Sequence, residues 1–201
     1  SNIYIQLLLI STIWLGFIGG LDDYIKVFRH NKEGLKGRFK IVGQVGLGII
    51  VGTTMWLSQD IVIHDKNFET KSFEIVDKES GEIQRQSVKF VTNTTPDKSA
   101  KTSIPFLKDT ELNYNILTGG NDTAAWIVYI LVAIFVITAV SNGANLTDGI
   151  DGLLTSVSVP IVLVLGILAY LSGHLIYSDY LNIMYLPDSG EMVVFAAAFA
   201  G

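Results

Sequence analysis

Long uncharged stretches alternate with polar segments along the chain, and this pattern sets the expected architecture. Three runs without Asp, Glu, Lys or Arg cover residues 1–21, 41–59 and 123–147. Each approaches or exceeds the ~20 residues that an α-helix needs to cross a bilayer. A fourth apolar run follows Gly152, and a fifth begins at Met192. The sequence therefore predicts an all-α polytopic membrane protein, built as a bundle of transmembrane helices.

The polar stretch 60–122 has a different character. Residues Ser72–Val76 and Ile83–Val91 have the pattern of strands on either side of a turn at 78–81. Eight basic and eleven acidic residues are interspersed through the stretch, which is typical of a solvated surface. We therefore expect a small extracytoplasmic β-hairpin insertion between the membrane helices.

Positive charge predicts how the helices are oriented. The linker 22–40 carries six Lys or Arg against three acids, and short basic loops stay on the cytoplasmic side. The first helix then ends on the cytoplasmic side, and the stretch 60–122 lies on the opposite side of the membrane. Residues 142–151 lie on the cytoplasmic side again, at the same membrane surface as Asp22. We therefore expect three units within one larger membrane domain. Residues 1–58 form two transmembrane helices with a basic cytoplasmic loop at 22–40, and residues 59–122 form an extracytoplasmic insertion. Residues 123–201 form further transmembrane helices with a cytoplasmic loop at 142–152.

Composition narrows the chemistry. Only 16% of the residues are charged and the mean hydropathy is +0.44, whereas about a quarter of a soluble chain is charged. A net charge of -5 argues against a nucleic-acid partner. Cysteine is absent, which excludes disulfides and thiolate sites, and His30, His64 and His174 are scattered. Any metal would therefore be held by oxygen, which favours Mg²⁺.

The first candidate cluster lies where the first apolar run ends. Asp22 and Asp23 are adjacent, and Lys26 follows four residues after Asp22. A surface helix pair of this kind contributes only ~0.2 to 0.5 kcal/mol and has no functional meaning by itself. Adjacent carboxylates at a lipid boundary are costly, however, and such charges usually have a function or a partner.

The second cluster is a polar series with a spacing of three: Asn142, Asn145, Asp148 and Asp151. A polar helix end with a capping acid would account for one of these residues, but it does not account well for four polar residues at a regular spacing. No Lys or Arg occurs after Lys108, so the two acids need either the basic 22–40 linker or a divalent cation as counter-charge. Carboxylates, a cation and lysines at a lipid interface are the components of phosphoryl transfer, with a lipid phosphate as the expected substrate.

At these two clusters the sequence resembles the polyprenyl-phosphate N-acetylhexosamine-1-phosphate transferase superfamily, most closely its phospho-N-acetylmuramoyl-pentapeptide transferases. The resemblance covers nearly the whole chain outside the insertion, which is longer than the family's short hairpin, but only about the middle half of a ten-helix family member. It places a third acidic motif, the main Mg²⁺ ligand, and a His-rich loop after Gly201. The matching segments are 22–27, 34–40 and 145–153, with 168–173 and 190–193 as weaker matches.

The resemblance implies transfer of phospho-N-acetylmuramoyl-pentapeptide from its UDP carrier to undecaprenyl phosphate, which gives lipid I and UMP with Mg²⁺ as cofactor. The protein is expected in the bacterial inner membrane, with its active face on the cytoplasmic side. A homodimer is one oligomeric state that the sequence leaves open. By resemblance, the catalytic and metal-proximal residues are Asp22, Asp23 and Asp148, with Asp22 as a candidate base. The expected substrate-binding residues are Lys26, Asn145, Asp151, Arg38 and Lys40.

Three alternatives stay open on the sequence alone. The nearest is the same chemistry with UDP-N-acetylglucosamine as donor. An intramembrane aspartyl protease also pairs Asp residues from separate helices, but it needs one protonated carboxyl within the membrane, away from cations. A transporter or channel predicts acids near mid-helix, which the apolar runs lack.

Overall fold

The computed structural model describes residues 2–29, 34–76, 83–103, 111–147 and 152–201. Four of its helices are long and apolar enough to cross a membrane: α1 (Ile3–Phe28), α2 (Gly37–Leu57), α4 (Asp122–Thr147) and α5 (Leu153–Ser172). The shorter helical elements are α3 (Tyr114–Leu117), α6 (Leu175–Tyr180), the 3₁₀ turn η1 (Pro187–Ser189) and α7 (Gly190–Ala200). The predicted helical membrane fold with a hairpin insertion is confirmed.

Large apolar side chains cover the outer surfaces of these helices. Ile13 and Phe17 of α1 are 72% and 67% exposed, and Phe135 of α4 is also exposed. Contiguous apolar surface of this extent is unfavourable in water but is the normal surface of a helix in lipid. The exposed faces therefore fit a membrane bundle.

Helix α1 extends further than its apolar run. The uncharged residues end at Leu21, but the helix continues through Asp22 and Asp23 to Phe28. Lys26 lies in its last turn, where a positive charge offsets the helix dipole. The acidic pair therefore lies on the last two turns of the helix instead of in the loop after it.

The fourth apolar run is divided into two helices. Helix α5 ends at Ser172 and α6 begins at Leu175. The end of α5 is fixed by the following segment, because Leu186 N–H donates to the Ser172 carbonyl at 2.9 Å and Ser189 Oγ donates to the Ala169 carbonyl at 2.7 Å.

Glycines bring α2 and α4 into close contact. A Cβ placed on Gly48 would lie 2.7 Å from Cα of Ile134, and one on Gly52 would lie 3.2 Å from Cα of Ile130. Small residues allow this backbone approach between membrane helices. Gly48 and Gly52 therefore set the distance between α2 and α4.

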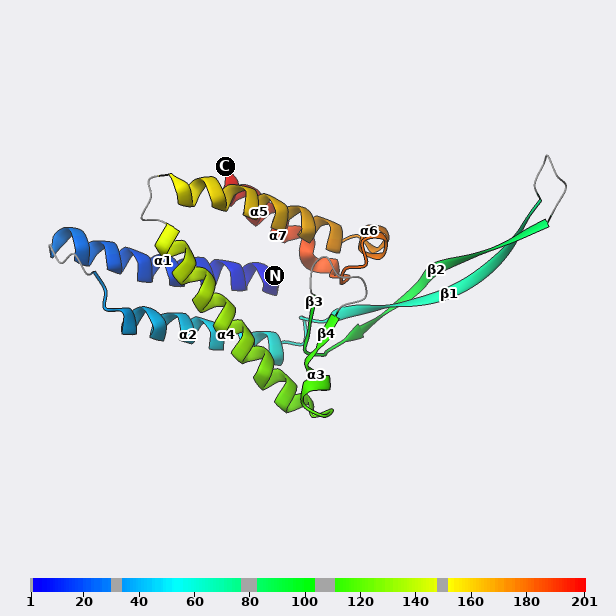
Figure 1. Cartoon of the computed structure of the whole chain (residues 1–201), viewed down its shortest axis with the longest axis horizontal. Coiled ribbons are helices and arrows are strands. Elements are labelled where there is room, and N and C mark those ends of the chain that lie inside the picture. Colours follow the sequence, from blue (N-terminus) through cyan, green and yellow to red (C-terminus); the bar gives the residue numbers. More distant parts are fainter. Residues whose placement is uncertain (1, 30–33, 77–82, 104–110, 148–151) are drawn as a thin grey trace.

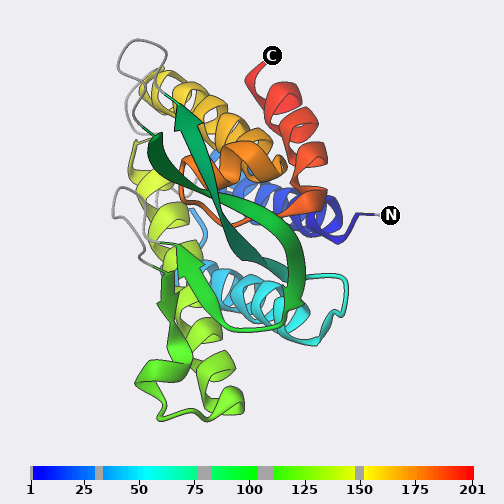
Figure 2. The ribbon, with the colours of Figure 1, turned by 90° about the vertical axis from the view of Figure 1, so that its right-hand side faces the viewer.

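The insertion is a long antiparallel hairpin. Strands β1 (Ile63–Val76) and β2 (Ile83–Asp97) pair from Ile63 with Asp97 to Val76 with Ile83, with a bulge near Asn67. Both strands are longer than the sequence predicted, and the predicted turn at 78–81 lies outside the described residues. Figure 1 shows the hairpin reaching away from the helices, and Figure 2 shows the strong twist expected of a two-stranded ribbon.

A short second hairpin joins this arm to the helices. It pairs β3 (Lys101–Ser103) with β4 (Glu111–Asn113). The hydrophobic core beneath it contains Ala100, Tyr114, Ala125 and Trp126, packed against partly buried residues that include Trp56 and Tyr129. This core lies where α2 ends and α4 begins.

A lysine links the base of the hairpin to the end of α2. Lys98 Nζ donates to the carbonyls of Met55 and Ile61, each at 2.7 Å, and also to that of Ser58. The ammonium lies 5.5 Å from the ring centre of Trp126. Burial lowers the pKa of Lys98. The side chain satisfies carbonyls that the end of a helix leaves without partners.

Asp22 and the described members of the second cluster, Asn142 and Asn145, lie at the end of the bundle opposite the hairpin. There α1 ends, α2 begins, α4 ends and α5 begins (Figure 1). The prediction that Asp22 and the segment beginning at Asn142 share one end is therefore confirmed for the described residues. The cytoplasmic identity of that end stays a prediction.

Candidate functional site

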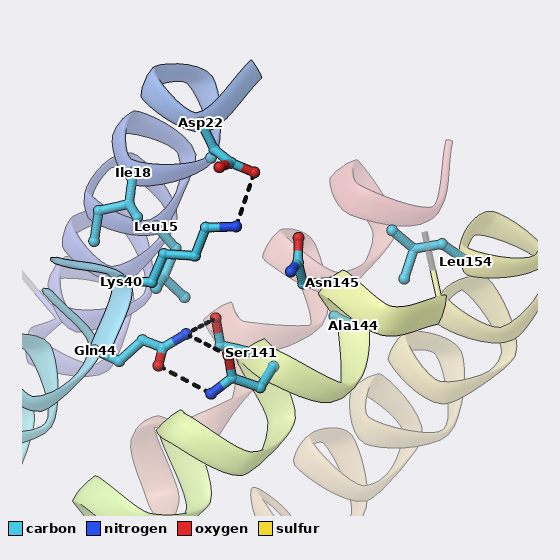
Figure 3. Close-up of a pocket in the computed structure, with 11 residues that line it drawn as sticks. Leu15, Ile18, Asp22, Lys40, Gln44, Ser141, Ala144, Asn145 and Leu154 are labelled. Carbon is cyan, nitrogen blue, oxygen red and sulfur yellow. Dashed lines mark hydrogen bonds and ion pairs between the residues drawn. The ribbon is translucent and has the colours of Figure 1, made fainter. Parts of the chain in front are cut away.

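A cavity of about 300 Å³ lies between the C-terminal parts of α1 and α4 and the first turns of α2 and α5. It joins the two sequence motifs, because Asp22 contributes to one wall and Asn145 to another (Figure 3). The described residues that line it are Leu15, Ile18, Gly19, Asp22, Lys40, Gln44, Ser141, Asn142, Ala144, Asn145 and Leu154.

Asp22 is buried and surrounded by hydrogen-bond donors. The residue is only 3% exposed. Its Oδ2 lies 2.7 Å from Lys26 Nζ and 2.9 Å from Lys40 Nζ, and its Oδ1 accepts the Leu35 N–H at 2.7 Å. The pair with Lys26 that helix spacing suggests does form, but Asp22 is not a surface charge. It joins α1, the linker and α2 at one point.

Gly34 makes this arrangement possible. Its φ is +65°, a backbone conformation that side chains with a Cβ rarely adopt. A Cβ at this position would also collide with Asp22 Oδ1 and lie 2.8 Å from Cε of Lys26. A glycine is therefore needed for the chain to turn close enough for the Leu35 N–H to reach the carboxylate.

Helix α2 contributes two polar side chains one turn apart. Lys40 binds Asp22, and Gln44 reaches the opposite neighbour, α4. Gln44 Nε2 donates to Ser141 Oγ at 3.0 Å and to Asn142 Oδ1 at 3.5 Å, while Asn142 Nδ2 donates back to Gln44 Oε1 at 3.1 Å. The two amides therefore pair reciprocally between the helices, as the dashed lines in Figure 3 show.

Asn145 lies one turn beyond this amide pair on α4. Its side chain is exposed and projects into the space between the Asp22–Lys40 pair and Leu154 (Figure 3). An amide offers both a donor and an acceptor. Asn145 can therefore bind a polar ligand that occupies the cavity opposite Lys40.

The remaining predicted residues divide into two groups. The side chain of Asp23 is 76% exposed and lies 4.0 Å from Lys26, and Lys26 and Arg38 are exposed as well. None of these three residues is among the described residues that line the cavity. Asp148 and Asp151 lie outside the described residues. The structure therefore brings Asp22, Lys40 and Asn145 together and says nothing of the two later acids.

The oxygen-bearing groups described at this end of the bundle fit Mg²⁺ only in part. Within the described ranges there is no group of three His, Cys, Asp or Glu side chains that could hold a metal. Asp22 accepts hydrogen bonds on both oxygens, from two lysines and an amide. Asp23 has an exposed carboxylate and Asn145 has a carbonyl oxygen, which are the hard ligands that Mg²⁺ prefers. Among the described residues, Asp23 and Asn145 therefore offer oxygen ligands to a metal but do not form a complete metal site.

Sequence reasoning did not single out Gln44. It is the one amide side chain within α2 and lies four residues after Lys40. Polar side chains within membrane helices usually face another helix, so this isolated amide was a usable signal. Leu35, whose contribution is its backbone N–H, could not have been found from side-chain chemistry.

Comparisons with known proteins agree with the motifs. Residues 85–200, more than half of the chain, match the profile described as Glycosyl transferase family 4. Curated proteins named phospho-N-acetylmuramoyl-pentapeptide-transferase are similar over the full chain. Those of Phocaeicola vulgatus, Flavobacterium psychrophilum and Bacteroides fragilis are 53%, 50% and 51% identical, and the chain covers 46%, 48% and 46% of them, respectively. The chain thus spans about half the length of these relatives.

Proposed function

The chain belongs to glycosyl transferase family 4, and on that basis we propose that the protein of which it forms part is a phospho-N-acetylmuramoyl-pentapeptide transferase. The proposed donor is UDP-N-acetylmuramoyl-pentapeptide and the acceptor is undecaprenyl phosphate. An acceptor phosphate oxygen bonds to the phosphorus that carries the sugar, the diphosphate P–O bond breaks, and UMP leaves. The products are UMP and lipid I, the first lipid-linked precursor of peptidoglycan.

The observation that carries this proposal is the cavity shared by the two motifs. Lys40 and Asn145, more than a hundred residues apart in the sequence, both line it. Reactions between two phosphate compounds depend on positioning and on neutralisation of negative charge. A cavity with an ammonium on one side and an amide on the other meets both needs.

Each side chain has a proposed part in the reaction. Lys26 and Lys40 would bind phosphate oxygens, and Asp22 would hold both ammonium groups in place between turnovers. Asn145 would bind the nucleotide-sugar side, and Asp151 would lie towards the uridine, while Arg38 would add positive charge at the surface. Asp22 would have to release a lysine before it could accept a proton. An acceptor phosphate is already largely ionised at neutral pH, since its second pKa is ~6. We therefore assign Asp22 an electrostatic role in preference to a basic one.

Magnesium is the proposed cofactor. Asp23 and Asp148 would be its ligands from this chain, and Asp22 would lie close by. When bound, the ion would offset the negative charge of the diphosphate. The exposed carboxylate of Asp23 supports this role, since its oxygens are accessible to an ion from solvent.

The chain is part of a multi-pass membrane protein. Its four apolar helices and its relatives support that statement. We place it in the bacterial inner membrane with the cavity on the cytoplasmic side, because the basic linker 22–40 borders the cavity end. A cytoplasmic nucleotide donor and a lipid acceptor can meet only there. A homodimer is a further proposal that awaits measurement of the molecular mass in detergent.

A donor-choice assay tests the proposal. Membranes containing the full-length protein are given undecaprenyl phosphate, Mg²⁺ and either UDP-N-acetylmuramoyl-pentapeptide or UDP-N-acetylglucosamine, and labelled lipid product is extracted. We expect product from the muramoyl donor alone. Product from the N-acetylglucosamine donor alone would assign the protein to the other branch of the chemistry, and no lipid product from either donor would refute transfer altogether.

A further inference from the structure

We infer that Gln44 is a positioning residue, which sets the place of Asn145 relative to Lys40 across the cavity. The inference rests on the proposed function, because the position of Asn145 matters only if a ligand binds between these side chains. Gln44 is 4% exposed and lies on α2 between Lys40 and the α2–α4 contact at Gly48.

The spacing of residues along α2 explains why Gln44 has this influence. Lys40, Gln44, Gly48 and Gly52 recur every four residues, and side chains four apart lie on one face of a helix. The two glycines hold α4 at backbone contact. Towards the cavity this close contact ends, and the Gln44 amide becomes the polar link between the two helices.

The hydrogen bonds also fix the orientation of α4. Gln44 and Asn142 exchange amide hydrogen bonds at 3.1 and 3.5 Å, and Gln44 also donates to Ser141 Oγ at 3.0 Å. Asn142 Nδ2 donates in addition to the Thr138 carbonyl at 2.9 Å, which holds its side chain against its own helix. A rotation or slide of α4 would break these bonds, and Asn145, only one turn further along, would move with it.

The same side of α2 therefore holds both walls of the cavity. Lys40 fixes Asp22 of α1, and Gln44 fixes the last turns of α4. Gln44 is not a catalytic residue, because its amide is fully engaged with α4 and does not need to touch a substrate. Removal of the Gln44 amide should therefore weaken binding of the UDP donor more than it lowers the amount of folded protein.

The test compares steady-state kinetics of full-length variants in detergent or membranes. Gln44→Met keeps the side-chain length and removes the hydrogen bonds, Asn142→Leu removes the partner, and the double variant combines them. Thr53→Val is the matched control, since Thr53 on α2 donates its hydroxyl to the carbonyls of Ile49 and Ile50 in its own helix. We expect Gln44→Met to raise the KM for the UDP donor about five-fold, and the double variant to be no worse than the more impaired single variant.

Other outcomes separate the two levels of the proposal. Unchanged KM and kcat for Gln44→Met would overturn the positioning role, as would a lower rate at unchanged KM, which would indicate only less folded enzyme. Additive KM effects of the two single substitutions would also overturn it. If the unaltered protein makes no lipid product, the proposed function itself fails, and the inference fails with it.

Discussion

The two ends of the helical bundle each contain a lysine that binds groups of its own chain, but they use it differently. At the hairpin end, Lys98 donates to carbonyls at the end of α2 and lies over Trp126, beside a core of packed aromatic rings. At the cavity end, Lys40 binds the buried carboxylate of Asp22 next to open space. One lysine completes the backbone of a helix, and the other borders a cavity of about 300 Å³.

This contrast distinguishes a structural cation from one available for a ligand. The carbonyls that Lys98 binds are fixed parts of the chain at the end of α2, so a ligand that took the ammonium would leave three backbone groups without their lysine partner. Lys40 is bound to a carboxylate that has Lys26 as a second cation. A phosphate could therefore approach Lys40 while Asp22 keeps another positive partner. Substitution of Lys98 should therefore lower the stability of the fold, whereas substitutions at the cavity end should lower the rate of transfer.

The largest expected effect is on transfer at the cavity end. Asp23→Asn removes an exposed carboxylate whose main proposed work is to hold the metal, and we expect the rate to fall by about a hundredfold or more. Asp148→Asn should behave in the same way. Both proteins should insert normally, because neither change removes a described core contact. The measurement is lipid product per mole of inserted protein, with Asp60→Asn at the hairpin end as the control. Turnover at the unaltered rate by either variant would remove these acids from the mechanism.

A smaller effect on transfer, combined with loss of stability, is expected for Gly34→Ala. The added Cβ would meet the Asp22 carboxylate at a φ of +65°, and such backbone strain costs about 1 to 3 kcal/mol. The Leu35–Asp22 hydrogen bond should be lost, and the rate should fall about tenfold. Gly37→Ala is the matched control in the same linker, since nothing lies within 4 Å of its Cβ position. Equal thermal stability and equal rates for the two variants would contradict the proposed requirement for glycine.

At the hairpin end, Lys98→Met should affect stability alone. The variant loses hydrogen bonds to the carbonyls of Met55, Ser58 and Ile61, and we expect a loss of about 1 kcal/mol because the site is partly solvated. The melting temperature in detergent should fall, while the KM for the UDP donor stays unchanged. A KM that rises as much as it does for a cavity variant would abolish the distinction between the two lysines.

The smallest effect is a pH dependence at the base of the hairpin. Burial acts to raise the pKa of Asp97, but hydrogen bonds from Lys101 and Ser99 and the charge of Lys101 outweigh it, so the pKa is lowered. A lowered pKa stabilises the fold above the unfolded value of about 3.9, and this stability is lost as the pH falls through the folded value. The pair is partly exposed, so the contribution is about 0 to 1 kcal/mol. Between pH 7 and pH 3 the melting temperature should fall less steeply for Asp97→Asn than for the unaltered protein. Equal slopes of melting temperature against pH would contradict this assignment.

Much of this comparison could be predicted from the sequence. Hydropathy located the four long helices, and the order of these helices along the chain placed Asp22 and Asn145 at one end, as the shared cavity confirms. The sequence did not show that α1 continues through Asp22, because the helix is extended there by ion pairs and a linker contact that no apolar pattern records. It also did not reveal the length of β1 and β2, whose pairing from Ile63 onwards depends on contacts between distant segments.

The site itself was predicted in part, for a physical reason. Lys26, Lys40 and Asn145 were proposed from charge and resemblance, whereas the amide pair between Gln44 and Asn142 depends on how α2 and α4 are rotated against each other. That rotation is set by the backbone contacts at Gly48 and Gly52. A motif shows which groups are available, but it does not show which of them are already engaged with one another.

Thiol cross-linking across the cavity tests the central claim most directly. Gly19→Cys and Ala144→Cys place one thiol on α1 and one on α4, in a full-length protein whose other cysteines have been replaced. Both positions line the cavity, and a Cβ at residue 19 meets no atom within 4 Å. A short bis-maleimide should join this pair and stop lipid product formation, and it should not join Ile10→Cys with Ala144→Cys, because Ile10 lies about 13 Å further along α1. Failure of the 19–144 pair to cross-link, or undiminished transfer by the cross-linked protein, would contradict a shared site between the two motifs.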